Sequence, residues 1–500
     1  MRICNPMADA GSAEKRSDSE SPKPPQEIVS VTHGRVKIKG NDVPYTATAG
    51  TIVLYEDDPE FKQAPKAKAT VFYVAYTRSD VDDQTTRPIT FSFNGGPGSA
   101  SVWMHLGLLG PKRVLMADET GNLPAPPFRL VENEYSLLDQ SDLVFIDPIS
   151  TGYSRAATGE NPNQFHQFTK DIESISDFIR LYTSRAKRWL SPKYIIGESY
   201  GTTRGSAITN YLQNRYGMYL NGIMLISSIL DFQTVEMDPG NDIAYVVILP
   251  TYAATAWYHN KLDAKLQLSL SDTLAEVEAF AAGEYATALL QGDSLAEGKR
   301  RSVVRKLARY TGLSERFIDH SNLRIDLMRF TKELLRDQQR TVGRLDSRFV
   351  GIDRDPTREA FEYDPSYAVI HGPYSATFND YVRRELKFES DEPYEILTSK
   401  VRPWKYDKHE NQYVSVTEAL RSAISQNPYL KVFVASGFFD FATPYYATLH
   451  TFNHLGLDQT LRNNIVIKHY EAGHMMYTHL PSLAELKSDL EAFISQTKNV

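Results

Sequence analysis

The sequence of 500 residues contains a single cysteine, Cys4. No disulfide can therefore form within the chain, and no thiol-based site is expected. The fold must be stabilised by burial of apolar surface, which a chain of this length can supply. Hydrophobic residues make up 41% of the sequence and charged residues 23%, and both values are ordinary for a globular protein.

Several other features that define functional classes are missing. No apolar run has the length needed to span a bilayer, so no membrane span is expected. The net charge of −7 gives no reason to expect a nucleic-acid partner. The 12 histidines include no H-E-x-x-H or similar spacing, so we predict neither a metal site nor another cofactor.

Residues 1–27 are polar and rich in Ser, Glu, Lys and Pro, which predicts a disordered N-terminal tail. The tail lacks the apolar segment of a signal peptide. At face value this indicates a cytoplasmic protein; if the start is trimmed or misassigned, export to the periplasm or the medium is the alternative. Nothing in the sequence fixes the oligomeric state.

The most informative stretch is a Gly-x-Ser-x-Gly motif at residues 197–201. It follows an apolar run, residues 193–196, which predicts a buried strand. A periodic segment after it, residues 202–212, predicts a helix. Strand, sharp turn and helix are the context in which this motif presents a nucleophilic serine, here Ser199. Small residues at 197 and 201 let the strand and the helix approach each other closely.

A second glycine-rich turn follows another predicted strand, residues 89–93. It reads Asn94, Gly95, Gly96, Pro97, Gly98. Consecutive glycines leave backbone N–H groups uncovered, and proline stiffens the loop, as an oxyanion hole requires. A phosphate-binding loop is excluded because no Gly-Lys-Ser/Thr follows.

The rest of the chain predicts an α/β fold with an insertion. A β-meander (residues 28–78), with separate strands expected at 45–48 and 52–55, precedes strands that alternate with helices, which favours a mixed, mostly parallel sheet. We expect a first core part at 28–230, a mostly helical cap insertion at 231–404, and a second core part at 405–500. Asn163 is the expected N-cap of the helix before the nucleophile strand.

Two further candidates lie in the second core part, each just past the end of a predicted strand. Asp440 follows the strand at 430–436, and His474 follows the strand at 465–470. A serine hydroxyl needs an imidazole to take its proton, and an acid holds the imidazole in the correct tautomer. Ser199, Asp440 and His474 occur in the chain order of α/β-hydrolases, so we predict that they form a catalytic triad.

Together these motifs resemble the serine carboxypeptidase family, which has the α/β-hydrolase fold. The resemblance covers about 380 residues and rests on the segments 94–98, 145–154, 197–201, 437–444 and 472–475. The fit is closest to a bacterial-type branch that lacks the usual cysteines. The resemblance implies an oxyanion hole made by the N–H groups of Gly96 and Tyr200. It also implies a site for the substrate's terminal carboxylate, made by Asn94, the N–H of Gly95 and Glu198.

The carboxylate site has a physical consequence and one departure from the family. Two carboxylates can share a hydrogen bond only if one is protonated, so we expect peptide cleavage to be favoured at acidic pH. Family members carry a second glutamate that pairs with the residue at the position of Glu198. Counting from the Leu-Gly-Pro at 109–111, this position is Leu108 here.

The predicted function is therefore that of a serine carboxypeptidase acting on peptides with a free C-terminal carboxylate, through an acyl-enzyme. The main alternative is an esterase or acyltransferase with the same triad, which the loss of the second glutamate favours slightly. Related Gly-Gly-Pro-Gly hydrolases also include aminopeptidases, which match the motif at 197–201 less well. A catalytically inactive hydrolase fold that serves as a binding module is a fourth interpretation.

Overall fold

The computed structural model describes residues 25–56 and 65–498. Most of the expected disordered tail, with Cys4, therefore lies outside the described residues. At the end of that tail, Glu27 is ion-paired with Arg185 at 2.8 Å and accepts a hydrogen bond from the backbone of Val53 at 2.9 Å. None of the described helices is long and apolar enough to cross a membrane.

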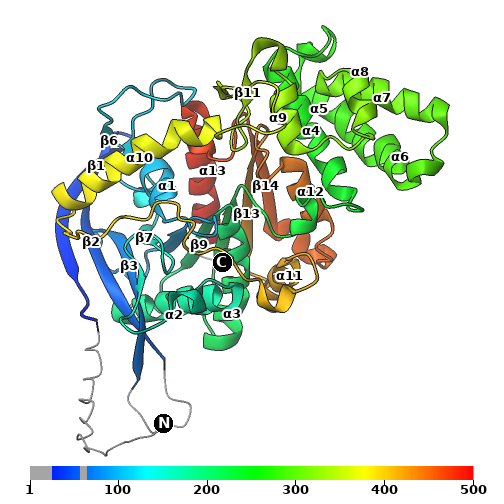
Figure 1. The fold of residues 1–500 in the computed structure, drawn as a ribbon. Helices are drawn as coiled ribbons and strands as arrows, with labels where there is room; N and C mark the ends of the chain where they lie inside the picture. The colour runs from blue at the N-terminus through cyan, green and yellow to red at the C-terminus, as the bar shows by residue number, and fades with distance from the viewer. Residues whose placement is uncertain (1–24, 57–64, 499–500) are drawn as a thin grey trace, which may run out of the picture.

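A ten-stranded sheet forms the centre of the molecule (Figure 1). Its order is β1-β2-β3-β7-β4-β9-β10-β13-β14, and β8 pairs with β3 outside this path. The strands are β1 (Val29–Ile38), β2 (Asn41–Glu56), β3 (Lys66–Arg78), β4 (Ile89–Phe93), β7 (Asp142–Ile146), β8 (Arg155–Ala156), β9 (Lys193–Glu198), β10 (Gly222–Ile226), β13 (Lys431–Gly437) and β14 (Ile465–Tyr470). Neighbours from β1 to β7 are antiparallel, and those from β7 to β14 are parallel. The predicted mixed, mostly parallel sheet is confirmed.

Helices cover both faces of the sheet, which explains why its parallel strands are continuous apolar runs. The covering helices are α1 (Val102–Met104), α10 (Pro365–Arg384) and α13 (Leu480–Thr497) on one face, and α2 (Phe168–Arg185), α3 (Tyr200–Tyr216) and α11 (Thr417–Gln426) on the other. Successive residues of a strand point to opposite faces. In β9, Tyr194 and Ile196 accordingly pack with the first group of helices, whereas Ile195 packs with the second.

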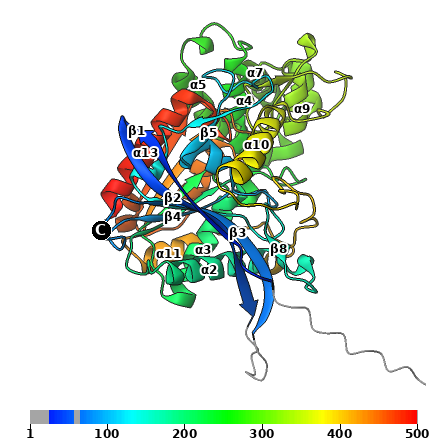
Figure 2. The same ribbon diagram turned by 90° about the vertical axis from the view of Figure 1, so that its left-hand side faces the viewer.

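The helices between β10 and α10 form a further apolar core of their own (Figures 1 and 2). They are α4 (Ile243–Tyr258), α5 (Leu270–Phe280), α6 (Ala286–Gln291), α7 (Glu297–Thr311), α8 (Glu315–His320) and α9 (Leu327–Glu333). The helix α12 (Tyr445–Asn453) follows β13 and packs on α4. Two short hairpins, β5 (Lys112–Val114) with β6 (Leu130–Glu132) and β11 (Thr341–Val342) with β12 (Val350–Gly351), complete the strands.

Two local predictions differ from the structure. The separate strands expected at 45–48 and 52–55 are parts of the one strand β2, which continues through Gly50 because it pairs with its neighbours on both sides. Asn163 is not the N-cap of α2. It lies in a short 3-10 turn, Pro162–Phe165, and Gln167 precedes the helix.

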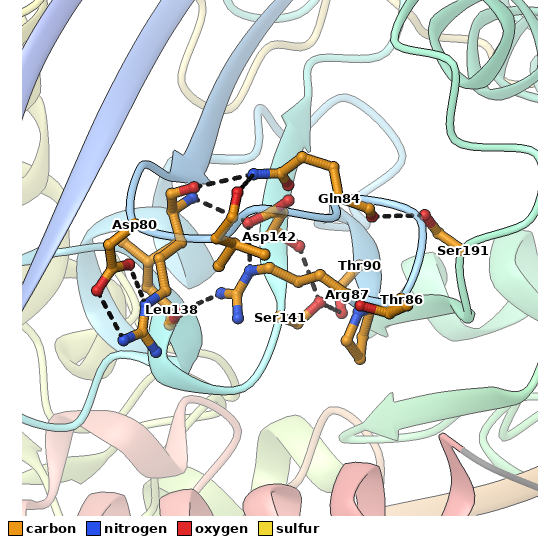
Figure 3. A network of polar contacts seen from close by, with 12 residues as sticks. Asp80, Gln84, Thr86, Arg87, Thr90, Leu138, Ser141, Asp142 and Ser191 are labelled. Carbon is orange, nitrogen blue, oxygen red and sulfur yellow. Dashed lines mark hydrogen bonds and ion pairs between the residues drawn. The ribbon is translucent and has the colours of Figure 1, made fainter.

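A buried charge network closes the edge of the sheet at which the parallel strands begin (Figure 3). Asp142, the first residue of β7, pairs through Oδ1 with Arg87 at 2.7 Å and through Oδ2 with Arg188 at 2.5 Å. Arg87 also donates to the carbonyl of Leu138 at 2.5 Å, and Thr90 bonds Ser141 at 2.7 Å. The network ties together the segments that lead into β4, β7 and β9.

Candidate active site

The predicted site residues meet at the opposite edge, where parallel strands end. Asn94 follows β4 and Ser199 follows β9 directly. Asp440 is the third residue after the end of β13, and His474 is the fourth after the end of β14. The carboxyl ends of parallel strands meet at one edge of a sheet, which is where such folds collect reactive groups. Four segments far apart in the sequence are thereby brought together.

Ser199 occupies a strained turn between β9 and α3. Its backbone has φ 60° and ψ −131°, in a region that non-glycine residues rarely adopt. The tight turn needs glycine on both sides: a Cβ on Gly197 would lie 2.2 Å from the carbonyl oxygen of Gly201. The N–H of Ser199 donates to the carbonyl of Ile226 at 3.0 Å, which fixes the turn against β10.

Asp440 and His474 form a buried hydrogen-bonded pair. His474 Nδ1 lies 2.7 Å from Asp440 Oδ2. Since a carboxylate can only accept, Nδ1 carries the proton and Nε2 is left free to accept one. The Asp440 carboxylate also accepts from the Thr443 hydroxyl at 2.6 Å and from the Ala442 N–H at 2.7 Å. Burial lowers the pKa of His474, but Asp440 more than offsets this, so that the pKa is raised.

Ser199 and His474 line the same cavity, but no hydrogen bond joins them among the described residues. Of the three predicted triad residues, only Asp440 and His474 are therefore hydrogen-bonded to each other. A loose serine–histidine contact is common before substrate binds, and it tightens in the reactive complex.

The loop of residues 94–98 packs tightly against the start of α3. A Cβ on Gly95 would lie 2.5 Å from the Tyr200 nitrogen, so only glycine permits this approach. Gly96 has φ +105°, which also requires glycine. Both predicted oxyanion donors, Gly96 and Tyr200, line the cavity beside Ser199.

Glu198 and Asn94 are in contact, as the resemblance implied. Glu198 is buried, and its Oε1 accepts a hydrogen bond from Asn94 Nδ2 at 3.0 Å. Its Oε2 accepts one from the hydroxyl of Tyr477 at 2.5 Å. Burial raises the pKa of Glu198 to about 7. The protonated form is therefore populated at neutral and acidic pH.

Tyr477 is a site residue that the sequence reasoning missed. It lies in a 3-10 turn, Met476–Thr478, three residues after His474, and that spacing is the one signal that could have drawn attention to it. Leu108, at the position of the expected second glutamate, belongs to a π-helical turn, His105–Leu109, and is buried in the core. Where a second glutamate was expected to pair with Glu198, the hydroxyl of Tyr477 donates a hydrogen bond to it instead.

A cavity of about 710 Å³ opens over these groups. It is lined by all the predicted site residues except Asp440, that is by Asn94, Gly95, Gly96, Glu198, Ser199, Tyr200 and His474. Aromatic and aliphatic side chains, among them Trp103, Tyr367 and Phe441, form much of the remaining wall. Three ionisable side chains outside the predicted set, Arg344, Arg402 and Glu236, also line it.

No group of three or more His, Cys, Asp or Glu residues in the described part of the chain is arranged to hold a metal ion. The site itself offers a strained serine, Ser199, a histidine with a free Nε2, His474, and a buried carboxyl group, Glu198. Backbone N–H groups of the glycine-rich loop lie beside them.

The sequence of the chain is similar to those of known carboxypeptidases. The model of the serine carboxypeptidase family matches residues 61–479. The pheromone-processing carboxypeptidase KEX1 of Saccharomyces cerevisiae is 31% identical over 159 residues, which is 30% of this chain and 20% of that protein. The chain thus matches about a fifth of the length of this curated relative.

The structure also aligns with solved structures of peptidases. The crystal structure of Kex1(Δ)p, a prohormone-processing carboxypeptidase from Saccharomyces cerevisiae, aligns with a TM-score of 0.56 and 15% identity, covering 90% of this chain and 91% of that one. A proline iminopeptidase from Mycobacterium smegmatis aligns with a TM-score of 0.35 and 14% identity, covering 89% and 99%. The predicted α/β-hydrolase fold is confirmed. By the match over residues 61–479, the chain belongs to the serine carboxypeptidase family.

Proposed function

We propose that the protein is a serine carboxypeptidase that removes the C-terminal residue of peptides through an acyl-enzyme on Ser199. The proposal is supported by family membership and by the cavity that Ser199 and His474 both line. His474 Nε2 takes the Ser199 proton as Oγ attacks the carbonyl carbon of the last peptide bond.

The remaining steps follow from the same groups. The negative charge on the carbonyl oxygen is stabilised by the N–H groups of Gly96 and Tyr200. His474 then gives its proton to the leaving nitrogen, the C–N bond breaks, and the terminal amino acid departs. Water, deprotonated by His474, then attacks the ester carbonyl carbon. The bond to Ser199 Oγ breaks, Oγ takes the proton back from His474, and the shortened peptide leaves as its acid. Asp440 stabilises the imidazolium that forms in each half of the cycle.

Glu198 is the observation that carries the assignment to a carboxypeptidase. A buried carboxyl group with a pKa of about 7, next to the nucleophile, is protonated under acidic conditions and can donate to a substrate carboxylate. We propose that it does so together with Asn94 and the N–H of Gly95. The hydroxyl of Tyr477 holds Glu198 in place. It takes the role expected of the family's second glutamate, whose position is occupied by Leu108 here.

The test uses an N-blocked peptide as the free acid and as the C-terminal amide. Both are incubated at pH 5 with the protein and with Ser199→Ala, and the products are followed by mass spectrometry. We expect stepwise trimming of the free acid by the wild type, with the amide cleaved far more slowly and no cleavage by the variant. Cleavage of neither peptide, with hydrolysis of simple esters, would refute the proposal and favour an esterase or acyltransferase.

A further inference from the structure

A segment of the helical region, residues 344–348, lies between the two loops that carry Asp440 and His474. We call it the bridging segment. The carbonyl of Arg344 accepts from the N–H of Phe441 at 3.1 Å, next to Asp440. The carbonyl of Leu345 accepts from the N–H of His474 at 2.7 Å. The backbone of the bridging segment is therefore fixed by the loops of the predicted triad themselves.

The first residue of the bridging segment, Arg344, contributes a positive charge to the wall of the cavity. Its N–H donates to Asp364 Oδ1 at 3.0 Å, so its backbone is held on both sides. Its guanidinium, however, makes no ion pair or hydrogen bond with any described residue, although the residue lines the cavity. Arg348, four residues later, shows the usual alternative: it is paired with Asp346 at 2.7 and 3.0 Å. A half-buried arginine with no partner in the described part of the chain is suited to bind an anion that arrives with the substrate.

Among the described residues, none of the other charged side chains that line the cavity pairs with Arg344, so its guanidinium is available to a substrate. Glu236 lines the cavity but forms no ion pair with Arg344, and burial raises its pKa. Arg402 is exposed at the rim and adds a second positive charge. Glu198 is uncharged below its pKa of about 7. Outside the predicted site residues, the charged side chains that line the cavity are thus two arginines and one glutamate, so an acidic side chain fits it better than a basic one.

We propose that Arg344 is a specificity-determining residue that binds the carboxylate of an aspartate or glutamate at one of the two substrate residues flanking the scissile bond. This inference rests on the proposed carboxypeptidase function. The fork of the guanidinium matches a side-chain carboxylate in two parallel hydrogen bonds. The substrate's terminal carboxylate is a separate group, bound by Asn94, Gly95 and Glu198.

The experiment measures kcat/KM at pH 5.5 for N-blocked peptides that differ only in their last two residues. Glu, Gln, Lys and Ala are placed in turn at the last and at the penultimate position. We expect a preference for Glu over Gln of about ten- to a hundredfold at one of the two positions. In Arg344→Gln this preference falls to near one, because the rate on the Glu peptide falls by more than the rates on the Gln and Ala peptides.

Two variants serve as controls. Arg340→Gln removes a positive charge four residues away that does not line the cavity, and it should keep the preference for Glu. Arg344→Glu should reverse the preference towards Lys at the same position. Equal loss of rate on all free-acid peptides in Arg344→Gln would mean that Arg344 binds the terminal carboxylate, and it would overturn the inference. Cleavage of the Ala peptides by the wild type without any preference for Glu would also overturn it, whereas cleavage of no peptide would refute the proposed function instead.

Discussion

Replacing Glu198 by Gln separates the two ionisations on which peptide cleavage depends. Gln has nearly the same shape. Its amide oxygen can accept from Asn94 where Oε1 of Glu198 does, and its NH2 group can donate to the hydroxyl oxygen of Tyr477 and to a substrate carboxylate. In the wild type, peptide cleavage needs Glu198 protonated and His474 neutral at the same time. The first requirement limits the rate at high pH, and the second limits it at low pH.

The size of the high-pH effect follows from the pKa of about 7. About 99% of Glu198 is protonated at pH 5 and about 10% at pH 8. The protonated fraction falls about fiftyfold between pH 7 and pH 9, so we expect kcat/KM on free-acid peptides to fall by about this factor beyond any effect of other ionising groups. In Glu198→Gln this fall disappears.

The same substitution predicts a change in stability that does not depend on catalysis. The pKa of Glu198 is about 7 in the folded chain and near 4.5 when unfolded. The folded state therefore holds this proton more tightly, and its contribution to the free energy of unfolding is lost as pH rises from about 4.5 to about 7. The loss is at most roughly 3 kcal/mol. The decline between pH 5 and pH 8 should be smaller in Glu198→Gln by up to this amount.

The assay is a pH profile of kcat/KM from pH 4 to pH 9, measured on a free-acid peptide and on an ester that lacks a terminal carboxylate. Glu236→Gln, which changes the other carboxylate that lines the cavity, is the matched control and should keep the high-pH limit. A Glu198→Gln profile that still falls above pH 7 on the peptide alone would refute the assignment of this limit to Glu198.

Two further predictions concern contacts outside the reacting groups. Asp142→Asn leaves Arg87 and Arg188 buried without a carboxylate. Urea denaturation should therefore show a loss of about 3–5 kcal/mol in the free energy of unfolding. A loss below about 1 kcal/mol would show that this network contributes little to stability. Tyr477→Phe removes a hydrogen bond that lowers the pKa of Glu198. The high-pH limit of peptide cleavage should therefore move to higher pH, and KM should rise several-fold. A limit that moves to lower pH would show that this hydrogen bond does not act on Glu198.

The sequence allowed the sheet to be predicted because each parallel strand is a short apolar run that ends in a glycine-rich or acidic turn. Ser199, Asp440 and His474 could be selected for the same reason, since each follows such a run and parallel strands end at one edge. The continuous strand β2 was missed because Gly50 interrupts the local pattern, whereas pairing with two neighbours outweighs the cost of one glycine in a strand.

Contacts across long sequence distances could not be predicted. Tyr477 and Glu198 are 279 residues apart, and no local pattern indicates that a tyrosine three residues after His474 turns back to this carboxyl group. The bridging segment was hidden in the same way. It is irregular, and its backbone hydrogen bonds go to loops about 100 residues further along the chain, so neither periodicity nor propensity marks it.

The central claim, covalent catalysis by Ser199, is tested most directly by trapping the acyl-enzyme. The protein is mixed with an excess of an activated ester of an N-blocked amino acid, quenched in acid within milliseconds, digested and examined by mass spectrometry. We expect the acyl group on Ser199 in the wild type, no adduct in Ser199→Ala, and a greatly slowed appearance of the adduct in His474→Ala. Turnover of the ester with no adduct on Ser199, or with an adduct on another residue that also forms in Ser199→Ala, would contradict the claim.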